Sequence, residues 1–345
     1  MNLKKFAIGA IAVLALTSCA QSPTDADSAQ NASNGSNTTL IVYSGRNEAF
    51  ISPFFEQFTN QTGIKIEARY GDSAELAALL LEEGNNSPAD VFLSQDAGAI
   101  GAVAQQNLLK KLEESVISEV PAQFRDEASN WVGITGRSRI IAYNKTKYTP
   151  EQLPKTIDDL VDPKWSGKIA IAPTNSSFQS FVTAIIQLRG ETKTLEWLKA
   201  LNNNKPQKYE KNGLIVEAID NGSVDLGLVN HYYIAEITES LGREINVDIA
   251  FFNDQDPGNL LNVSAFGILE SSKKQTAALN LLKYLLSNEA QQKFVNETFE
   301  YSLLLDINPP DGLPALGELE IPQVRLGQLS DVAKTQDLLI SSGLL

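Results

Sequence analysis

Residues 40–58, LIVYSGRNEAFISPFFEQF, join a short apolar run to an amphipathic segment through a polar turn. The apolar run at 40–43 predicts a buried strand. After the turn, apolar side chains recur at helical spacing and predict one buried helix face: Phe50, Ile51, Phe54, Phe55 and Phe58. Pro53 favours a helix that becomes regular at that point, with Ser52 as its cap. A strand followed by a helix is the repeating unit of α/β proteins.

The same alternation continues along the chain, which predicts an α/β fold. Further strands are expected at 64–70, 91–93, 131–136, 139–143, 168–172, 224–229, 247–252 and 263–269. Helices are expected from Asp72 or Ser73 to Gly84, and at 177–188, 192–201, 214–220 and 273–286.

Four polar clusters follow predicted strands: SGRN after Tyr43, SQD after Leu93, PTNSS after Ala172 and NHYY after Val229. In open α/β sheets, ligands bind beyond the carboxyl ends of the strands. The shared position of the four clusters therefore predicts that they converge on one site.

Length and charge limit the class of protein. A chain of 345 residues exceeds what one hydrophobic core usually serves, so two domains are expected. Its content of 43% hydrophobic and 20% charged residues is typical of a soluble globular protein. The formal net charge of -14 opposes binding of nucleic acid or of anionic membrane through the bulk surface.

The N-terminus has the pattern of an export signal. Residues 1–18 carry Lys4 and Lys5 before an apolar run too short to span a bilayer, and LTSC then resembles the lipobox of bacterial lipoproteins. We expect cleavage before Cys19 and a lipid on its sulfur; the alternative is an ordinary signal peptide. Residues 19–38 are expected to be the lipidated cysteine and a flexible tether. The body would then face the periplasm or the cell exterior, held to the membrane only by that lipid.

The stretch 228–236, LVNHYYIAE, contains adjacent tyrosines and the only histidine of the chain, His231. Asn230 is expected to cap a helix that begins at the tyrosines. Side chains of neighbouring helical residues are about 100° apart, so Tyr232 and Tyr233 can reach a common point. The positive end of a helix favours phenolate, and this hard oxygen donor suits trivalent iron. The alternative is that both rings only pack the helix against the sheet.

Several residues predict an anion site. The helix start after the strand at 168–172 offers backbone N–H groups, hydroxyls and an amide: Asn175, Ser176 and Ser177. Simple helix capping is the alternative. The guanidinium groups of Arg46, Arg137 and Arg139 match the paired oxygens of carboxylate, carbonate or phosphate, or else form surface salt bridges.

Enzyme motifs are missing from the sequence. It has no Gly-x-Ser-x-Gly, no His-Glu-x-x-His and no phosphate-binding loop, and Cys19 is its only thiol. We therefore expect that the protein is not an enzyme.

From Leu40 to near its C-terminus the chain resembles the periplasmic ferric-iron-binding subunits of bacterial ABC transporters. The matching segments include IVYSGRNE, SPADVFLSQDAG, WVGITGRSRIIAYN, DDLVDPKWSGKIAIAPTNSSF, KNGLIVEAIDNGSVDLGLVNHYY, DPGNLLNVSAFGILESSKK and FEYSLL. The resemblance implies the type II binding-protein fold, with two hinged α/β lobes joined by crossing strands. Lobe 1 would comprise 39–138 with 264–313, and lobe 2 would comprise 139–263 with 314–345.

The resemblance also implies roles for single residues. Tyr232 and Tyr233 match the two adjacent ferric ligands of the family, and Tyr143 matches a third tyrosine ligand of some members. The family's synergistic anion contacts match Asn175 to Ser177, Asn212 and Asn230. Two positions depart from the pattern: Asn47 stands where some members have a histidine ligand, and Gln95 where some have a glutamate. Because both are neutral, water or an anion such as carbonate, phosphate or citrate would complete the coordination.

The sequence thus predicts a monomeric substrate-binding lipoprotein that captures ferric iron, Fe(3+), either alone or together with a synergistic anion. It would deliver the ion to an ABC permease and its ATPase. Arg139 and Arg46 are the arginines expected to hold the anion. The alternative is a binding protein of the same fold for an oxyanion or a small organic anion, without metal.

Overall fold

The fold is seen in a computed structural model that describes residues 38–329 and 331–345. The expected signal peptide 1–18, the lipidated Cys19 and the tether up to residue 37 lie outside the described residues. Within those residues, no helix is long and apolar enough to cross a membrane.

The described residues alternate strands and helices, as the apolar pattern predicts. The strands are β1 Thr39–Ser44, β2 Lys65–Tyr70, β3 Val91–Ser94, β4 Val132–Asn144, β5 Ile169–Ile171, β6 Gln207–Lys208, β7 Leu226–Asn230, β8 Val247–Ala250, β9 Leu261–Ile268 and β10 Tyr301–Ser302. The α-helices are α1 Glu48–Thr62, α2 Ser73–Glu83, α3 Ala97–Gln105, α4 Glu114–Ile117, α5 Ser176–Arg189, α6 Glu191–Asn203, α7 Asn212–Asp220, α8 Tyr232–Leu241, α9 Gln275–Leu285, α10 Asn288–Thr298 and α11 Val332–Ser342.

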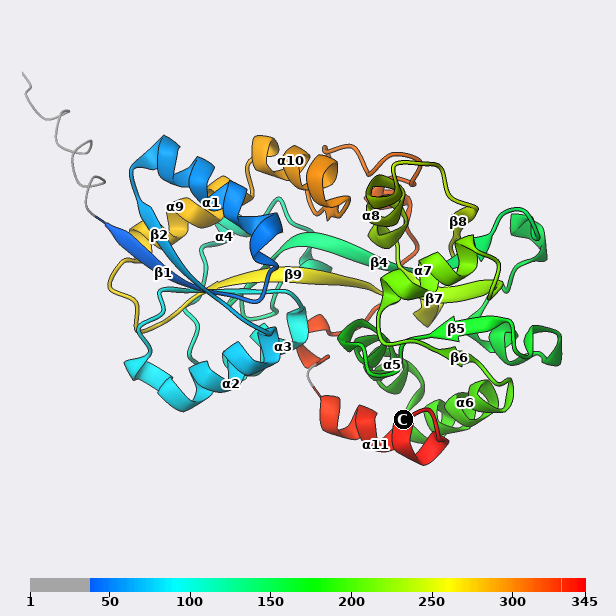
Figure 1. The fold of residues 1–345 in the computed structure, drawn as a ribbon. Coiled ribbons are helices and arrows are strands. Elements are labelled where there is room, and N and C mark those ends of the chain that lie inside the picture. Colours follow the sequence, from blue (N-terminus) through cyan, green and yellow to red (C-terminus); the bar gives the residue numbers. More distant parts are fainter. Residues whose placement is uncertain (1–37, 330) are drawn as a thin grey trace, which may run out of the picture.

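The strands join in the order β2-β1-β3-β9-β4-β7-β5-β6, with β8 and β10 also paired to β4. One lobe carries β1 to β3 with α1 to α3, α9 and α10, and the other carries β5 to β8 with α5 to α8 (Figure 1). Strands β1, β2 and β3 are parallel, as are β5, β6 and β7, whereas β9 and β4 run antiparallel to their neighbours. The parallel strands place the polar clusters at their carboxyl ends on the sides of the lobes that face each other.

Strand β4 connects the two lobes. Its residues up to Ser138 pair with β9, and those from Arg139 to Tyr143 pair with β7. Both β4 and β9 run from one lobe toward the other (Figure 1). The expectation of two separate strands at 131–136 and 139–143 is wrong, because Arg137 and Ser138 continue the strand. The Arg137 guanidinium is buried and donates a hydrogen bond to the Gln95 carbonyl oxygen, so this polar pair does not break the strand.

One predicted helix start, that of α1, and one predicted cap, that of α8, are wrong, whereas α8 begins at Tyr232 as expected. Helix α1 begins at Glu48, with Asn47 as its cap: the Asn47 side chain accepts from the Ala49 N–H at 2.9 Å. Pro53 is the sixth residue of this helix, so the only backbone bond missing at that point is the one that an N–H would donate to the Ala49 carbonyl. Asn230 does not cap α8, because it is the last residue of β7, where it pairs with Arg139.

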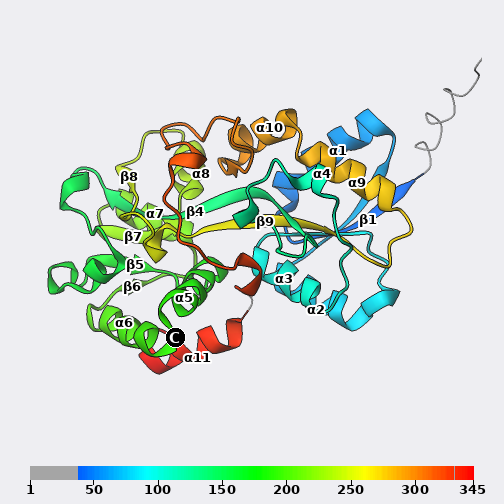
Figure 2. The same cartoon turned by 180° about the vertical axis from the view of Figure 1, so that it is seen from behind.

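The C-terminal segment passes behind the crossing strands and contacts both lobes (Figure 2). The short turn Leu326–Gln328 packs on α3, and α11 packs on α5 and α6. A Cβ atom on Gly101 would collide with the Gly327 carbonyl, so the two backbones touch there. Segment 314–345 therefore packs on α5 and α6 through α11 and also contacts α3 through residues 326–328.

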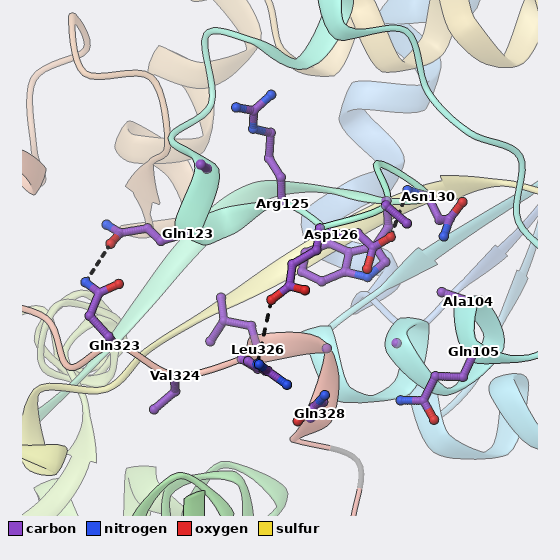
Figure 3. A pocket seen from close by; sticks show the side chains of 17 residues that line it. Ala104, Gln105, Gln123, Arg125, Asp126, Asn130, Gln323, Val324, Leu326 and Gln328 are labelled. Atoms are coloured by element: carbon purple, nitrogen blue, oxygen red, sulfur yellow. Dashed lines mark hydrogen bonds and ion pairs between the residues drawn. The ribbon is translucent and has the colours of Figure 1, made fainter. Parts of the chain in front are cut away.

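A cavity of about 590 Å³ lies beside this crossing. Figure 3 shows Gln123 and Gln323 hydrogen bonded across its wall, at 3.3 Å. It contains none of the candidate site residues, which lie together elsewhere.

Candidate metal centre

The adjacent tyrosines lie in the first turn of α8, directly after β7 and His231. Their ring centroids are 4.4 Å apart and the ring planes differ by 32°. Both rings line a cleft of about 710 Å³. The opposite wall consists of residues that follow β1, β2 and β3, among them Arg46, Asn47, Asp72 and Gln95. Three of the predicted polar clusters therefore meet in one cleft.

Burial controls the ionisation of Tyr232. It raises the pKa of Tyr232 well above its ordinary value of 10.0, and the neighbouring Tyr233 raises it further, while Arg137 opposes the shift. At Tyr232, burial therefore opposes the phenolate form that the positive end of the helix favours. A cation bound by both oxygens has to displace phenolic protons, so its affinity would fall as the pH falls.

His231 is buried behind the tyrosine pair and serves as a structural residue. Its Nδ1 accepts a hydrogen bond from the Ser138 N–H at 3.1 Å, and its Nε2 lies 2.8 Å from the Phe299 carbonyl oxygen, to which it donates. Burial lowers the pKa of His231 to about 4, so the ring is neutral at pH 7. These bonds fix the start of α8 against β4 and against the chain just before β10.

The fourth polar cluster lies beside the cleft. A small cavity there is lined by Arg139, Ser177 and Asn230, together with Gln95, which also lines the cleft. The Ser177 hydroxyl lies 3.0 Å from Arg139 Nη1 and 3.0 Å from Asn212 Nδ2, both of which can donate to it. The predicted anion residues of lobe 2 thus form one hydrogen-bonded group.

Asn175 has a double role in that group. Its side chain accepts from the Ser177 N–H at 3.0 Å and caps α5, as the alternative interpretation requires. It also accepts from Asn212 Nδ2 at 3.3 Å, and Asn212 Oδ1 is buried without a partner in the described part of the chain. Capping and membership of the anion group are therefore compatible.

Arg139 is a buried cation that no carboxylate neutralises within the described residues. Its side chain donates to the Leu228 carbonyl at 2.8 Å and lies over the Phe181 ring at 5.5 Å. Burial lowers the pKa of Arg139 to about 10, while Tyr233 and Tyr232 oppose the shift. An unneutralised buried charge is costly, so this guanidinium is suited to an anion that enters the small cavity.

Arg46, unlike Arg139, is already neutralised by a carboxylate of the chain. Its expected role in anion binding is therefore corrected. Its Nη1 and Nη2 each lie 2.8 Å from one carboxylate oxygen of Glu300. Thr135 Oγ1 donates to Glu300 at 2.6 Å, and Arg137 Nε lies 3.9 Å from it. Burial alone would raise the pKa of Glu300, but Arg46 and Arg137 hold it below the ordinary value.

Tyr143 lies away from the cleft. Tyr143 pairs with Leu226 in β7, whereas Arg139 pairs with Asn230 at the end of β7 that reaches the cleft. Tyr143 is four residues beyond Arg139 in β4, which corresponds to about 13 Å along the strand. Its hydroxyl lies 3.4 Å from Asp248 Oδ2, and it does not line the cleft. The expectation of a third tyrosine ligand is therefore wrong for this arrangement.

Asn47 and Gln95 lie on the cleft wall opposite the tyrosines, as their positions in the sequence imply. Asn47 is exposed and already serves as a cap, and Gln95 Oε1 is buried without a partner among the residues described. Neither supplies a negative charge.

Two carboxylates at the site were missed by the sequence interpretation. Glu300 was quoted only as part of FEYSLL, because nothing in its spacing indicates its distant partner Arg46. Glu236 lines the cleft with both tyrosines, and burial together with the charge of Glu300 raises its pKa to about 7. Its spacing of four and three residues from the tyrosines was the signal that could have identified it.

Comparisons with known proteins show the family and the fold of the chain. Residues 86–317 match the family described as "Bacterial extracellular solute-binding protein". The "Fe(3+)-binding periplasmic protein" of Serratia marcescens is 33% identical over the full length of both chains. The iron-bound structure of HitA from Pseudomonas aeruginosa has a TM-score of 0.81 at 32% identity, covering 89% of this chain and 100% of that one. The Trichodesmium protein IdiA (FutA), in complex with iron and citrate, has a TM-score of 0.79 at 28% identity, covering 88% and 99%. The predicted two-lobed type II fold is thereby confirmed.

Proposed function

The chain belongs to the bacterial extracellular solute-binding protein family, and from this premise we propose that it captures ferric iron between its lobes for an ABC transporter. The observation that carries the proposal is the pair of adjacent phenols in the cleft, one residue beyond His231. Two phenolates supply hard anionic oxygens, which suit a trivalent cation. The relatives named above bear names or titles that refer to iron, which supports the same cargo.

A synergistic anion completes the coordination in this proposal. On the cleft wall opposite the tyrosines, the two positions at which some family members carry ligands are the neutral Asn47 and Gln95, so we expect an anion from outside the chain to take part in the coordination. Beside the cleft is the polar group of Arg139, Ser177 and Asn212. The guanidinium of Arg139 is buried and has no carboxylate partner among the described residues. Carbonate, phosphate or a carboxylate of citrate has the paired oxygens that this guanidinium matches. The citrate in the Trichodesmium structure supports this choice.

Lobe closure would present the loaded protein to its transporter. We assign 39–138 with 264–313 to lobe 1 and 139–263 with 314–345 to lobe 2, and the change of partner in β4 after Ser138 supports the first boundary. Ferric ion stabilises the closed form because it contacts both walls only there. A permease and its ATPase then take up the ion, and the protein itself catalyses no reaction. It works as a monomer, exported and anchored by a lipid on Cys19.

A second function, binding of an oxyanion or a small organic anion without metal, is favoured by Arg139 alone. The buried guanidinium and its polar neighbours form a site that needs no iron to be useful. In that case the tyrosines would only shape the cleft.

Addition of ferric citrate to the purified protein distinguishes the two functions. Phenolate-to-iron charge transfer is expected to give a visible absorption band, which the double substitution Tyr232→Phe with Tyr233→Phe abolishes. Tyr143→Phe is the matched control and retains the band, because this ring lies outside the cleft. A colourless wild-type protein that citrate or phosphate alone stabilises against heat would refute iron capture and favour the second function.

A further inference from the structure

The proposed ferric site lacks one negative charge from the chain. A trivalent ion bound by two phenolates keeps one positive charge, and the half-buried cleft makes an unbalanced charge costly. Asn47 and Gln95, which face the tyrosines from the opposite wall, are neutral. The missing charge therefore comes either from an external anion alone or from a carboxylate of the chain.

Glu236 is placed to supply this charge. On a helix with about 100° per residue, it lies about 40° around the axis from Tyr232, between the directions of the two tyrosines. Side chains on a helix lean toward its N-terminus, so the carboxylate of Glu236 leans toward the turn that bears the phenols. All three side chains line the same cleft. Ile234 and Ile237 pack against the apolar core and do not line the cleft, whereas Tyr233 both packs against that core and lines the cleft.

The carboxylate of Glu236 has no other evident task. It is half-buried, and neither a hydrogen bond nor an ion pair engages it within residues 38–329 and 331–345. Of the other acids at the cleft, Asp72 caps α2 through the Ala74 N–H at 2.8 Å, and Glu48 is exposed on the opposite wall. Among the acids that line the cleft, Glu236 is the one on the helix of the tyrosines, so it keeps its distance to them whether the lobes are open or closed.

We propose that Glu236 is a third ferric-binding residue, which adds an anionic oxygen to those of Tyr232 and Tyr233. The inference rests on the proposed function and deepens it. With this carboxylate the chain itself neutralises the trivalent ion. The Arg139 group then needs only a weakly held anion, so iron binding does not depend strictly on one particular anion.

The test compares Glu236→Gln with the matched control Glu239→Gln, an exposed glutamate on the same helix. Each protein is titrated with ferric ion against citrate as competitor, and the charge-transfer band is recorded. For Glu236→Gln we expect affinity about 10- to 100-fold weaker, the size usual when a supporting group of a metal site is lost. We also expect its band at longer wavelength, because loss of an anionic donor leaves the iron a stronger acceptor of phenolate charge. Glu239→Gln is expected to match the wild type, and Glu236→Asp to recover part of the affinity.

The band position separates ligation from a structural effect, since a merely destabilised protein binds less iron without a shift in wavelength. Wild-type affinity and wavelength in Glu236→Gln would overturn this inference while the proposed function stands. If the wild type shows no band with ferric ion, the proposed function fails and this inference fails with it. Thermal unfolding of the iron-free variants is expected to match the wild type, which shows that the comparison concerns folded protein.

Discussion

Glu300 holds together the lobe 1 side of the cleft, and its substitution by glutamine tests that role. Glutamine keeps the shape of the side chain but removes the charge. Arg46 and Glu300 are only 2% and 5% exposed in their side chains, so solvent cannot compensate for the loss. Arg137, at 3.9 Å from the same carboxylate, loses its counter-charge as well.

The expected loss is large because the pair is buried. Removal of one partner of a buried ion pair typically costs about 3–5 kcal/mol, since the other charge stays buried and uncompensated. We expect Glu300→Gln to lower the free energy of unfolding by about that amount, and the loss to persist in high salt because buried pairs are weakly screened. Urea denaturation of the iron-free protein at pH 7 measures it from the shift of the midpoint.

Glu127→Gln is the control for this experiment. Glu127 pairs with Arg325 at 3.7 Å, but the two side chains are 85% and 68% exposed. Exposed pairs contribute about 0–1 kcal/mol, so this variant should unfold close to the wild type. A loss below about 1 kcal/mol in Glu300→Gln, or equal losses in both variants, would refute the buried charge cluster.

Three further predictions concern the effect of pH on stability, the binding of the anion and the contact between the C-terminal segment and α3. The pKa of His231 is about 4 in the folded protein and near 6.5 in the unfolded chain, so the unfolded chain binds more protons between these two pH values. Acidification from pH 6.5 to pH 4 should therefore lower the free energy of unfolding by about 3 kcal/mol. His231→Gln should flatten the dependence of unfolding free energy on pH from 4 to 6.5, and an unchanged slope would contradict the burial of a neutral ring. Arg139→Met should leave the anion-free protein as stable or more stable, yet abolish the rise in melting temperature caused by citrate; a retained rise would exclude the arginine as the anion's partner. Gly101→Ala should lower the free energy of unfolding by about 1–3 kcal/mol, because the added Cβ atom collides with the Gly327 carbonyl. Gly317→Ala is the control and should leave the free energy of unfolding unchanged, because Gly317 has open space around it. Equal denaturation midpoints of the two variants would show that the C-terminal segment does not pack tightly on α3.

The order of strands and helices could be predicted because it depends on local apolar spacing. The buried run at 40–43 and the helical repeat after it are visible in the sequence and are confirmed as β1 and α1. The start of α1 was missed because Pro53 outweighed Asn47 as a boundary signal, although Asn47 is also a good cap. Strand β4 was predicted as two strands because the polar pair Arg137 and Ser138 interrupts the apolar residues, whereas Arg137 is buried and bonded to the Gln95 carbonyl and so continues the strand.

The parts of the site that follow directly from the ends of strands could be predicted from the sequence. The parts that depend on ion pairs between residues far apart in the chain could not. The tyrosine pair and the group around Ser177 follow β7 and β5 directly, and their convergence follows from the sheet. Arg46 was misjudged because its partner Glu300 is 254 residues away in the chain. Tyr143 was misjudged because the resemblance of a segment does not fix which end of a long strand reaches the cleft.

The most direct test of the central claim is the anomalous diffraction of crystals loaded with ferric ion, recorded at the iron absorption edge. We predict a single strong peak in the cleft, bonded to the hydroxyl oxygens of both Tyr232 and Tyr233. An iron peak elsewhere, with the two rings turned into apolar packing away from the cleft, would contradict the account.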